Sequence, residues 1–201
     1  MPVHRLARPL LGLGLLISGV SCSDASAPGV RDDPSVRRVA SCQGPATDLP
    51  EAARASLRTG GTFVTSDDGW AALARDVPGG FAGVFYDGGR PVLLLTNPAR
   101  AAAAKAALAS RIPGFPVSSA EVRPARWTFA QLVDWGSYLM QSATLWQAGG
   151  IVSVDRDEVE NRLAYGVEDA VAQDRVAAAL AALDLPCDLV LIRIEGRVVA
   201  D

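Results

Sequence analysis

The sequence predicts an α+β fold of two consecutive ββαβ units joined by an amphipathic helix. Three observations predict it. Short apolar runs are paired through turn residues, each pair is followed by a helical stretch and a further apolar run, and the whole arrangement occurs twice. At one constant offset Arg90 aligns with Arg162 and Asn97 aligns with Asp169. We therefore expect a structural repeat in which strands and helices match.

The first unit is expected within residues 42–148, which include the linking helix. Asp87-Gly88 is a strong hairpin signal. Asn97 and Pro98 mark the start of an Ala-rich helix that reaches about residue 111, since proline is tolerated at the first helical position. The predicted strands are 62–65, 82–86, 91–96 and 119–125, with a short helix at 49–57 and another, capped by residues 66–68, that carries Trp70, Leu73 and Val77.

The linking helix is expected to begin at Thr128, because Thr128 and Gln131 have the spacing of a capping box. Apolar residues follow at helical spacing, namely Phe129, Leu132, Val133, Trp135 and Leu139. We expect Trp135, with Leu132 and Leu139, to pack between the two units. The helix is expected to end before Gly149-Gly150.

The second unit is expected at residues 149–201. Its strands are predicted at 151–155, 162–168 and 189–195, and Asp169 is expected to cap a helix that runs to residue 183. Each unit then has the order of elements found in half of a ferredoxin-like fold.

Residues 1–21 have the pattern of an export signal. Arg5 and Arg8 precede a short apolar run, and Ser21 is a small residue before Cys22. The run is about eleven residues, whereas a spanning helix needs about twenty. Gly19-Val20-Ser21-Cys22 resembles a bacterial lipobox, with Gly19 where Leu is usual, and implies that a lipidated Cys22 anchors the protein. The alternative is a secreted protein cut nearby, with Cys22 left as an odd thiol.

Residues 22–41 are polar and contain proline, so we expect a flexible tether between membrane and folded region. The chain carries a net charge of −3, and loss of Arg5 and Arg8 with the export signal makes it more acidic. Its arginines are scattered and Lys105 is its one lysine, so no nucleic-acid partner is expected. The expected location is the cell envelope through a lipid anchor, otherwise the periplasm or the medium.

Cysteine usage predicts a disulfide. If Cys22 carries lipid, Cys42 and Cys187 remain in an oxidising compartment. Their bond would close a loop of about 145 residues, and the chain-entropy model gives it about 4–5 kcal/mol. Two distant thiols are too few ligands for a metal site.

Catalytic motifs are not found. The one histidine is His4, which excludes Ser-His-Asp and Cys-His nucleophiles and histidine-ligated zinc in the exported protein. The sequence has no G-x-S-x-G, no S-x-x-K and no phosphate-binding glycine loop. We expect no catalytic residue, metal or cofactor. A carboxylate-dependent hydrolase stays open, because the distance between carboxylates is not visible in a sequence.

The acidic cluster of Asp155, Asp157, Glu158 and Glu160 does not fit a calcium loop. A loop counted from Asp155 needs Gly at its sixth place and Glu at its twelfth, and this chain has Glu160 and Gly166 there. We expect these side chains to be solvated charges of a hairpin.

Two tryptophans are candidates for a binding surface. Trp127 and Trp146 flank the linking helix, and together they would form an exposed aromatic patch for a protein or glycan partner. The alternative is that they belong to the core.

Three runs carry a resemblance to known proteins: PGGFAGVFYDGGRPVLLLTNPA, RPARWTFAQLVDW and GIVSVDRDEVENRLAYGVEDAVAQDRVAAALAALDLP. Over residues 63–195 the chain resembles a domain of bacterial exported proteins and the pro-regions of secreted chymotrypsin-like bacterial proteases. The resemblance implies small βαβ units and a surface that holds another polypeptide, without an active site. Since the sequence ends at Asp201, we expect no catalytic domain to follow.

The expected function is that of a non-catalytic envelope lipoprotein that binds a protein or peptide through sheet edges or the aromatic patch. Strand addition at an open sheet edge is the expected mechanism. The alternative is a stand-alone protease inhibitor or folding assistant.

Overall fold

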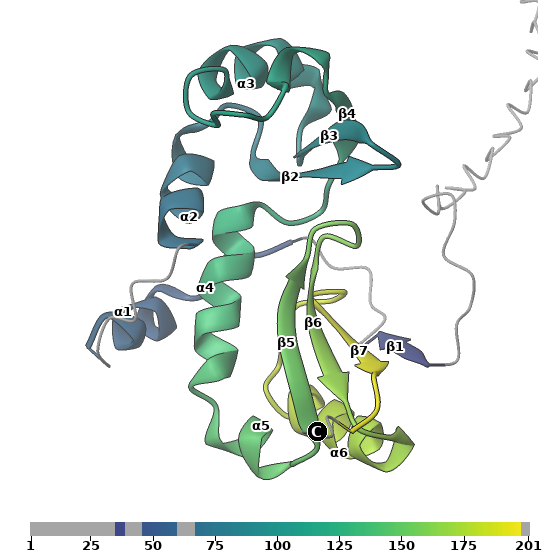
Figure 1. Ribbon diagram of the computed structural model, residues 1–201. Coiled ribbons are helices and arrows are strands. Elements are labelled where there is room, and N and C mark those ends of the chain that lie inside the picture. The colour runs from purple at the N-terminus through teal and green to yellow at the C-terminus, as the bar shows by residue number, and fades with distance from the viewer. Residues whose placement is uncertain (1–34, 39–45, 60–66, 198–201) are drawn as a thin grey trace, which may run out of the picture. The chain divides into compact units, whose positions relative to one another are not determined.

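The computed structural model describes residues 35–38, 46–59 and 67–197 (Figure 1). They form helices and two β-sheets, which confirms the predicted α+β class. Sheet A has the strand order β1-β7-β6-β5, and sheet B has the order β2-β3-β4. The export signal, Cys22, Cys42 and the strand expected at 62–65 lie outside the described residues. Of the helices that are described, none is long and apolar enough to cross a membrane.

Sheet B contains the first ββαβ unit. Strands β2 (Phe81–Asp87) and β3 (Arg90–Leu95) form an antiparallel hairpin, and β4 (Glu121–Pro124) lies parallel to β3. The crossover contains the 3-10 turns η1 (Pro98–Arg100) and η2 (Val117–Ser119) and the helix α3 (Ala101–Leu108). The strands agree with the sequence prediction, and α3 is shorter than expected.

The α-helix begins later than the sequence prediction, which placed its start at Asn97 and Pro98. The Asn97 side chain makes no capping hydrogen bond, because the chain enters a 3-10 turn at Pro98 before the α-helix begins.

Sheet A contains the second ββαβ unit. Strands β5 (Ile151–Asp157) and β6 (Arg162–Val167) are antiparallel, and β7 (Val190–Ile194) is parallel to β6. Between β6 and β7 runs α6 (Ala170–Ala181), whose Ala172 N–H donates to Asp169 Oδ1 at 2.8 Å. The predicted cap at Asp169 is therefore confirmed. The likeness of the two units to ferredoxin-like halves stays a prediction.

Strand β1 (Val36–Arg38) pairs antiparallel with β7. These residues lie within 22–41, so the expectation of a tether throughout that stretch is wrong at β1. Three residues have no apolar period of their own, and their strand conformation is stabilised by the partner strand.

The two units repeat each other in backbone detail. Each hairpin has a register shift near the start of its first strand, between Phe81 and Gly83 in β2 and between Ile151 and Ser153 in β5. The residue before each bulged strand is a glycine in the left-handed region, with φ of 69° at Gly80 and 78° at Gly150. The repeat inferred from the sequence is thus present in the hydrogen-bond pattern of the strands.

The remaining helices are α1 (Glu51–Thr59), α2 (Asp67–Asp76), α4 (Phe129–Met140) and α5 (Ala143–Gln147). Thr128 and Gln131 form both bonds of the predicted capping box at the start of α4. α4 ends earlier than expected, and Ser142 caps α5 by accepting from Leu145 N–H.

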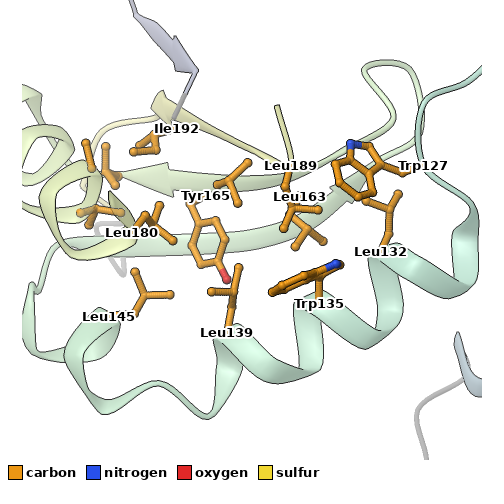
Figure 2. Packing of buried hydrophobic residues seen from close by; sticks show 14 of the residues in the cluster. Trp127, Leu132, Trp135, Leu139, Leu145, Leu163, Tyr165, Leu180, Leu189 and Ile192 are labelled. Atoms are coloured by element: carbon orange, nitrogen blue, oxygen red, sulfur yellow. The ribbon is translucent and has the colours of Figure 1, made fainter. Parts of the chain in front are cut away.

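α4 contributes side chains to the cores of both sheets. Figure 2 shows Leu132, Trp135 and Leu139 of α4 pointing toward β6, where they pack with Tyr165 and Leu163. On sheet B, Phe129 and Val133 of α4 belong to the other core cluster, which includes Phe81, Leu93, Leu95, Ala104 and Leu108. The linking helix therefore packs against both units, but through different residues. The expectation that Trp135, Leu132 and Leu139 pack between the units is wrong, because all three belong to the core of sheet A alone.

Candidate functional site

The edges of the two sheets are the candidate sites for a polypeptide. Among the described strands, β1 and β5 each have a single neighbour in sheet A, as do β2 and β4 in sheet B. Backbone N–H and C=O groups on the open side of such a strand are available to pair with another chain. The four edges differ in how open they are.

The β7 side of sheet A is occupied by β1. Ile194 N–H donates to the carbonyl of Ser35 at 3.0 Å, and Val36 pairs with Arg193. The Gln173 side chain of α6 also donates to the Ser35 carbonyl at 3.1 Å. This edge shows that a ββαβ unit accepts a further antiparallel strand beside its last strand.

The corresponding edge of sheet B is closed by a proline. Ala125 N–H donates to Leu95 O, and in the second unit Glu195 N–H donates to Val167 O, both at 2.9 Å. Pro124, the residue before Ala125, therefore holds the place of Ile194 but has no N–H to donate. A strand in the register of β1 loses that bond on β4, which is a known protection of edge strands.

Edge strand β2 is partly covered. Its first three residues, Phe81, Ala82 and Gly83, are buried. A Cβ placed on Gly83 would lie 3.6 Å from Cγ of Glu158, so the turn of the β5–β6 hairpin lies beside β2. Partial burial raises the pKa of the Glu158 carboxyl, and the nearby charges of Asp155 and Asp157 raise it further.

Edge strand β5 is exposed at its centre, at Val154 and Asp155, and half-buried elsewhere. None of its seven residues is buried, and the Val154 side chain is 38% exposed. Leu163 N–H of β6 donates to the carbonyl of Leu189, the residue before β7, so by alternation the backbone groups of Ala164 face β5. Ala164 pairs with Asp155, and consequently the backbone groups of Val154 and Arg156 point to the open side.

One outward backbone donor of β5, the N–H of Arg156, already has a hydrogen-bond acceptor. The N–H of Arg156 donates to Oδ1 of Asp155 at 2.8 Å. The guanidinium of Arg156 lies over the ring of Phe129 in α4, 5.9 Å from its centroid. Asp155 itself is exposed.

From the sequence, all the acidic hairpin residues are expected to be solvated, and this expectation is wrong for Asp157. Asp157 is only 12% exposed in its side chain and pairs with Arg193 of β7 at 2.5 Å. The first unit has the matching pair, since Arg123 of β4 lies 2.7 Å from Asp87 of β2. The hydrogen bond and charge of Arg123 lower the pKa of Asp87. In both ββαβ units an arginine of the last strand (β7 or β4) thus forms an ion pair with an aspartate at the end of the first strand (β5 or β2).

The expected aromatic patch does not form. Trp127 is 0% exposed, and its Nε1–H donates to the carbonyl of Asp188 at 3.2 Å, so this tryptophan belongs to the core of sheet A (Figure 2). Its backbone is fixed by the buried Asn161, whose Oδ1 accepts from Trp127 N–H at 2.7 Å. Trp146 is 41% exposed, and its ring N–H donates to Met140 O.

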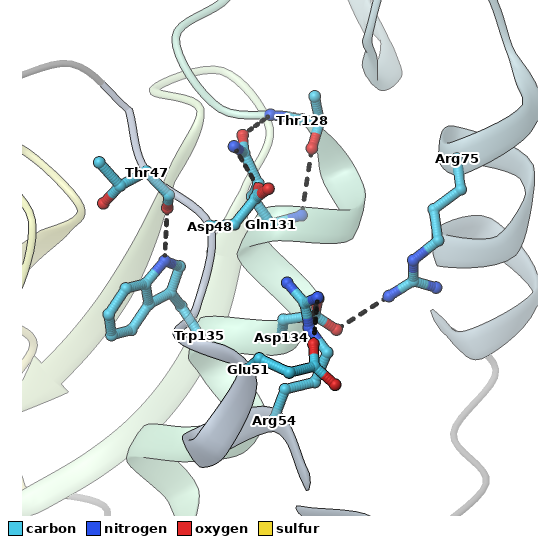
Figure 3. A network of polar contacts seen from close by, with 9 residues as sticks. All are labelled: Thr47, Asp48, Glu51, Arg54, Arg75, Thr128, Gln131, Asp134 and Trp135. Atoms are coloured by element: carbon cyan, nitrogen blue, oxygen red, sulfur yellow. Dashed lines mark hydrogen bonds and ion pairs between the residues drawn. The ribbon is translucent and has the colours of Figure 1, made fainter.

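A second polar cluster has a structural role. Figure 3 shows the Asp134 carboxylate of α4 between two arginines, 3.2 Å from Arg54 of α1 and 2.9 Å from Arg75 of α2. The neighbouring Trp135 donates its ring N–H to Thr47 O at 2.9 Å. These contacts join α1 and α2 to α4 and use the carboxylate internally.

Other features offer little chemistry. A hollow of about 260 Å³ is lined by Ser56, Tyr138, Gln141 and Ser142, without a carboxylate. Within the described ranges no group of three or more His, Cys, Asp or Glu is placed to hold a metal ion. Cys187 is disulfide-bonded, and because Cys42 lies outside the described residues the pairing of these two stays a prediction.

The chain was compared with known proteins. No protein-family model and no curated protein sequence matches it. A functional assignment therefore depends on the sheet edges, of which β5 is the longest that has neither a buried residue nor a proline.

Proposed function

We propose that the protein is a non-catalytic lipoprotein of the cell envelope that holds a polypeptide by adding it as a strand to the β5 edge of sheet A. The observation that carries the proposal is the open β5 edge, with Val154 at its centre. Strand addition supplies affinity through main-chain hydrogen bonds and specificity through alternate side chains.

The opposite edge of the same sheet supports the mechanism. Sheet A already takes β1 as an added antiparallel strand of only three residues. Strand β5 has seven residues, so it offers a longer ladder than the one that suffices for β1. The comparison with β4 also supports the proposal. β4 has a proline at the position where an added strand would need an N–H donor, whereas β5 contains no proline.

A peptide-binding experiment tests this function. The protein is purified from the secreted or envelope fraction of expressing cells and titrated into three labelled seven-residue peptides, in which Val alternates with Lys, Ser or Glu. We expect at least one peptide to bind and to slow the amide hydrogen exchange of Val154. Val154→Pro removes one outward N–H, so affinity should fall at least about fivefold.

Val171→Pro is the matched control. Val171 is 63% exposed and is the second residue of α6, where an N–H has no intrahelical partner and proline is tolerated. This variant should bind like the wild type. Absence of binding by all three peptides, or equal affinity of Val154→Pro and the wild type, would overturn the proposed function.

The membrane anchor is tested separately. Mass spectrometry of the mature N-terminus should find a diacylated Cys22, and Cys22→Ser should release the protein from the membrane fraction. An unmodified N-terminus beyond Cys22 would show a secreted protein instead.

A further inference from the structure

Among the described residues near the β5 edge, some carboxylates are in ion pairs and Asp155 is not. Arg193 pairs with Asp157 at 2.5 Å, and Arg162 lies 3.8 Å from Asp188. Asp157 also accepts a hydrogen bond from Glu160 N–H at 2.8 Å. Within the described part of the chain, Asp155 is in no ion pair, although its carboxylate is exposed beside the open backbone.

We infer that the strand held at the β5 edge carries a basic side chain opposite Asp155 and apolar side chains at the alternate positions. This inference rests on the proposed function and names the chemistry of its partner. Complementary charge is the first argument, since Asp155 is an exposed carboxylate that pairs with no cation among the described residues. The second is Val154, whose exposed side chain is suited to an apolar neighbour.

The geometry of an antiparallel ladder places the basic residue. Backbone groups of Asp155 face β6, so an added strand meets Asp155 in a non-hydrogen-bonded pair. In such a pair the two Cα atoms are about 4.5 Å apart and the side chains are in close contact. Opposite charges at these positions stabilise a strand pair, and like charges destabilise it.

The hydrogen bond between Arg156 N–H and Asp155 adds selectivity for a basic strand. While Asp155 Oδ1 accepts from Arg156 N–H, that N–H is not available to an incoming carbonyl. A lysine or arginine opposite Asp155 attracts the carboxylate away from Arg156 N–H, which can then donate to the added strand. A neutral strand leaves the carboxylate in place, and an acidic one is repelled.

A second copy of this chain is a poorer occupant. Antiparallel pairing of β5 with itself about Val154 places Ser153 opposite Asp155, and pairing about Arg156 places Asp157 there. Neither register supplies a cation. The occupant of the β5 edge is therefore an extended segment of another polypeptide in which apolar and basic residues alternate.

The three peptides distinguish the inference from the function on which it rests. At low salt the wild type should bind the Val/Lys peptide about two- to fivefold more tightly than the Val/Ser peptide, and the Val/Glu peptide least. Asp155→Asn should abolish this order while still binding the Val/Ser peptide. Asp184→Asn, a change of the same charge at an exposed site, should retain it.

Two results would overturn the inference and leave the function intact: equal binding of Val/Lys and Val/Ser by the wild type, or an unchanged order in Asp155→Asn. Failure of all peptides to bind would overturn both. Light scattering that finds a dimer in the wild type and a monomer in Val154→Pro would assign the edge to a second copy and overturn the inference.

Discussion

Pro124 in β4 takes the place that Ile194 holds in β7. Both precede the residue whose N–H bonds the middle strand of its sheet, Ala125 in one unit and Glu195 in the other. Ile194 donates its N–H to Ser35 of the added strand segment, whereas Pro124 has no N–H. One unit of the repeat thus accepts a strand at an edge where the other refuses it.

Replacement of this proline should open the β4 edge. Pro124→Ile restores a donor and a side chain suited to a strand, so we expect the variant to self-associate more than the wild type. Sedimentation velocity at increasing protein concentration measures the association. Pro113→Ile, which changes an exposed proline outside the sheets, is the control and should behave like the wild type. Equal association of Pro124→Ile and the wild type would show that Pro124 is not what closes this edge.

The two tryptophans should differ sharply in their contribution to stability. Trp127→Ala leaves a cavity in the core of sheet A, so the free energy of unfolding should fall by about 3–5 kcal/mol. Trp146 is 41% exposed, and Trp146→Ala should lower it by less than about 1 kcal/mol. Urea unfolding measures both. Similar losses in the two variants would contradict the burial of Trp127.

Asn161 should be as important as a large core side chain. Its Oδ1 accepts from Arg126 and Trp127 N–H, and its Nδ2 donates to Trp127 O at 2.9 Å. Asn161→Ala removes all three bonds from a residue only 6% exposed, so we expect a loss of about 3 kcal/mol in the free energy of unfolding.

The backbone at Asn161 supplies a matched comparison. Its φ of 52° is strained for alanine but not for glycine. Asn161→Gly should therefore be more stable than Asn161→Ala by about 1 kcal/mol, although both lack the side-chain bonds. A loss below about 1 kcal/mol in both variants would mean that the bonds to Trp127 contribute little.

The sequence predicts the repeated units well, because their signals are local. Hairpin glycines such as Gly88, the capping box at Thr128 and the cap at Asp169 act within four residues of their own position. The spacing of the apolar residues then indicates which face of each helix or strand lies in the core. The observed ends of the helices and strands differ from the predicted ones by a few residues. Even the closed edge has a local signal, since a proline inside a predicted strand indicates an edge.

The rest depends on contacts between distant residues. Strand β1 exists through pairing with β7, far along the chain, and nothing in Val36–Arg38 alone predicts it. Burial of Trp127 depends on Asn161, and the role of Asp157 depends on Arg193. The openness of β5 likewise follows from the order of strands in sheet A, which hydrophobic period does not determine.

The disulfide of Cys187 is expected to include Cys42. Peptide mapping without reduction should find the two cysteines in one linked peptide pair. Cys42→Ser and Cys187→Ser should each lower the free energy of unfolding by about 4 kcal/mol, and the double variant should lower it no further, because one bond is lost in all three. Additive losses, or a linked peptide that contains Cys22, would contradict this pairing.

Tyr165 has a buried hydroxyl group that no described residue satisfies. The side chain lies in the core of sheet A, between β6 and α4, and its Oη makes no hydrogen bond to the described part of the chain (Figure 2). A buried polar group in this state costs about 1–3 kcal/mol. Tyr165→Phe removes the hydroxyl and keeps the ring, so the free energy of unfolding should rise by about 1 kcal/mol at neutral pH. Tyr86→Phe, a change at a side chain that is exposed, should leave it unchanged.

The same residue predicts a loss of stability at alkaline pH. Burial raises the pKa of Tyr165 far above its ordinary value of about 10. Below pH 10 the hydroxyl is protonated in both the folded and unfolded states. Above pH 10 only the unfolded chain ionises, so the wild type should lose up to about 1.4 kcal/mol for each further pH unit. Tyr165→Phe lacks this group, and its advantage over the wild type should therefore grow between pH 10 and 11. An advantage that stays constant with pH would mean that Tyr165 ionises as readily in the folded protein as in the unfolded chain.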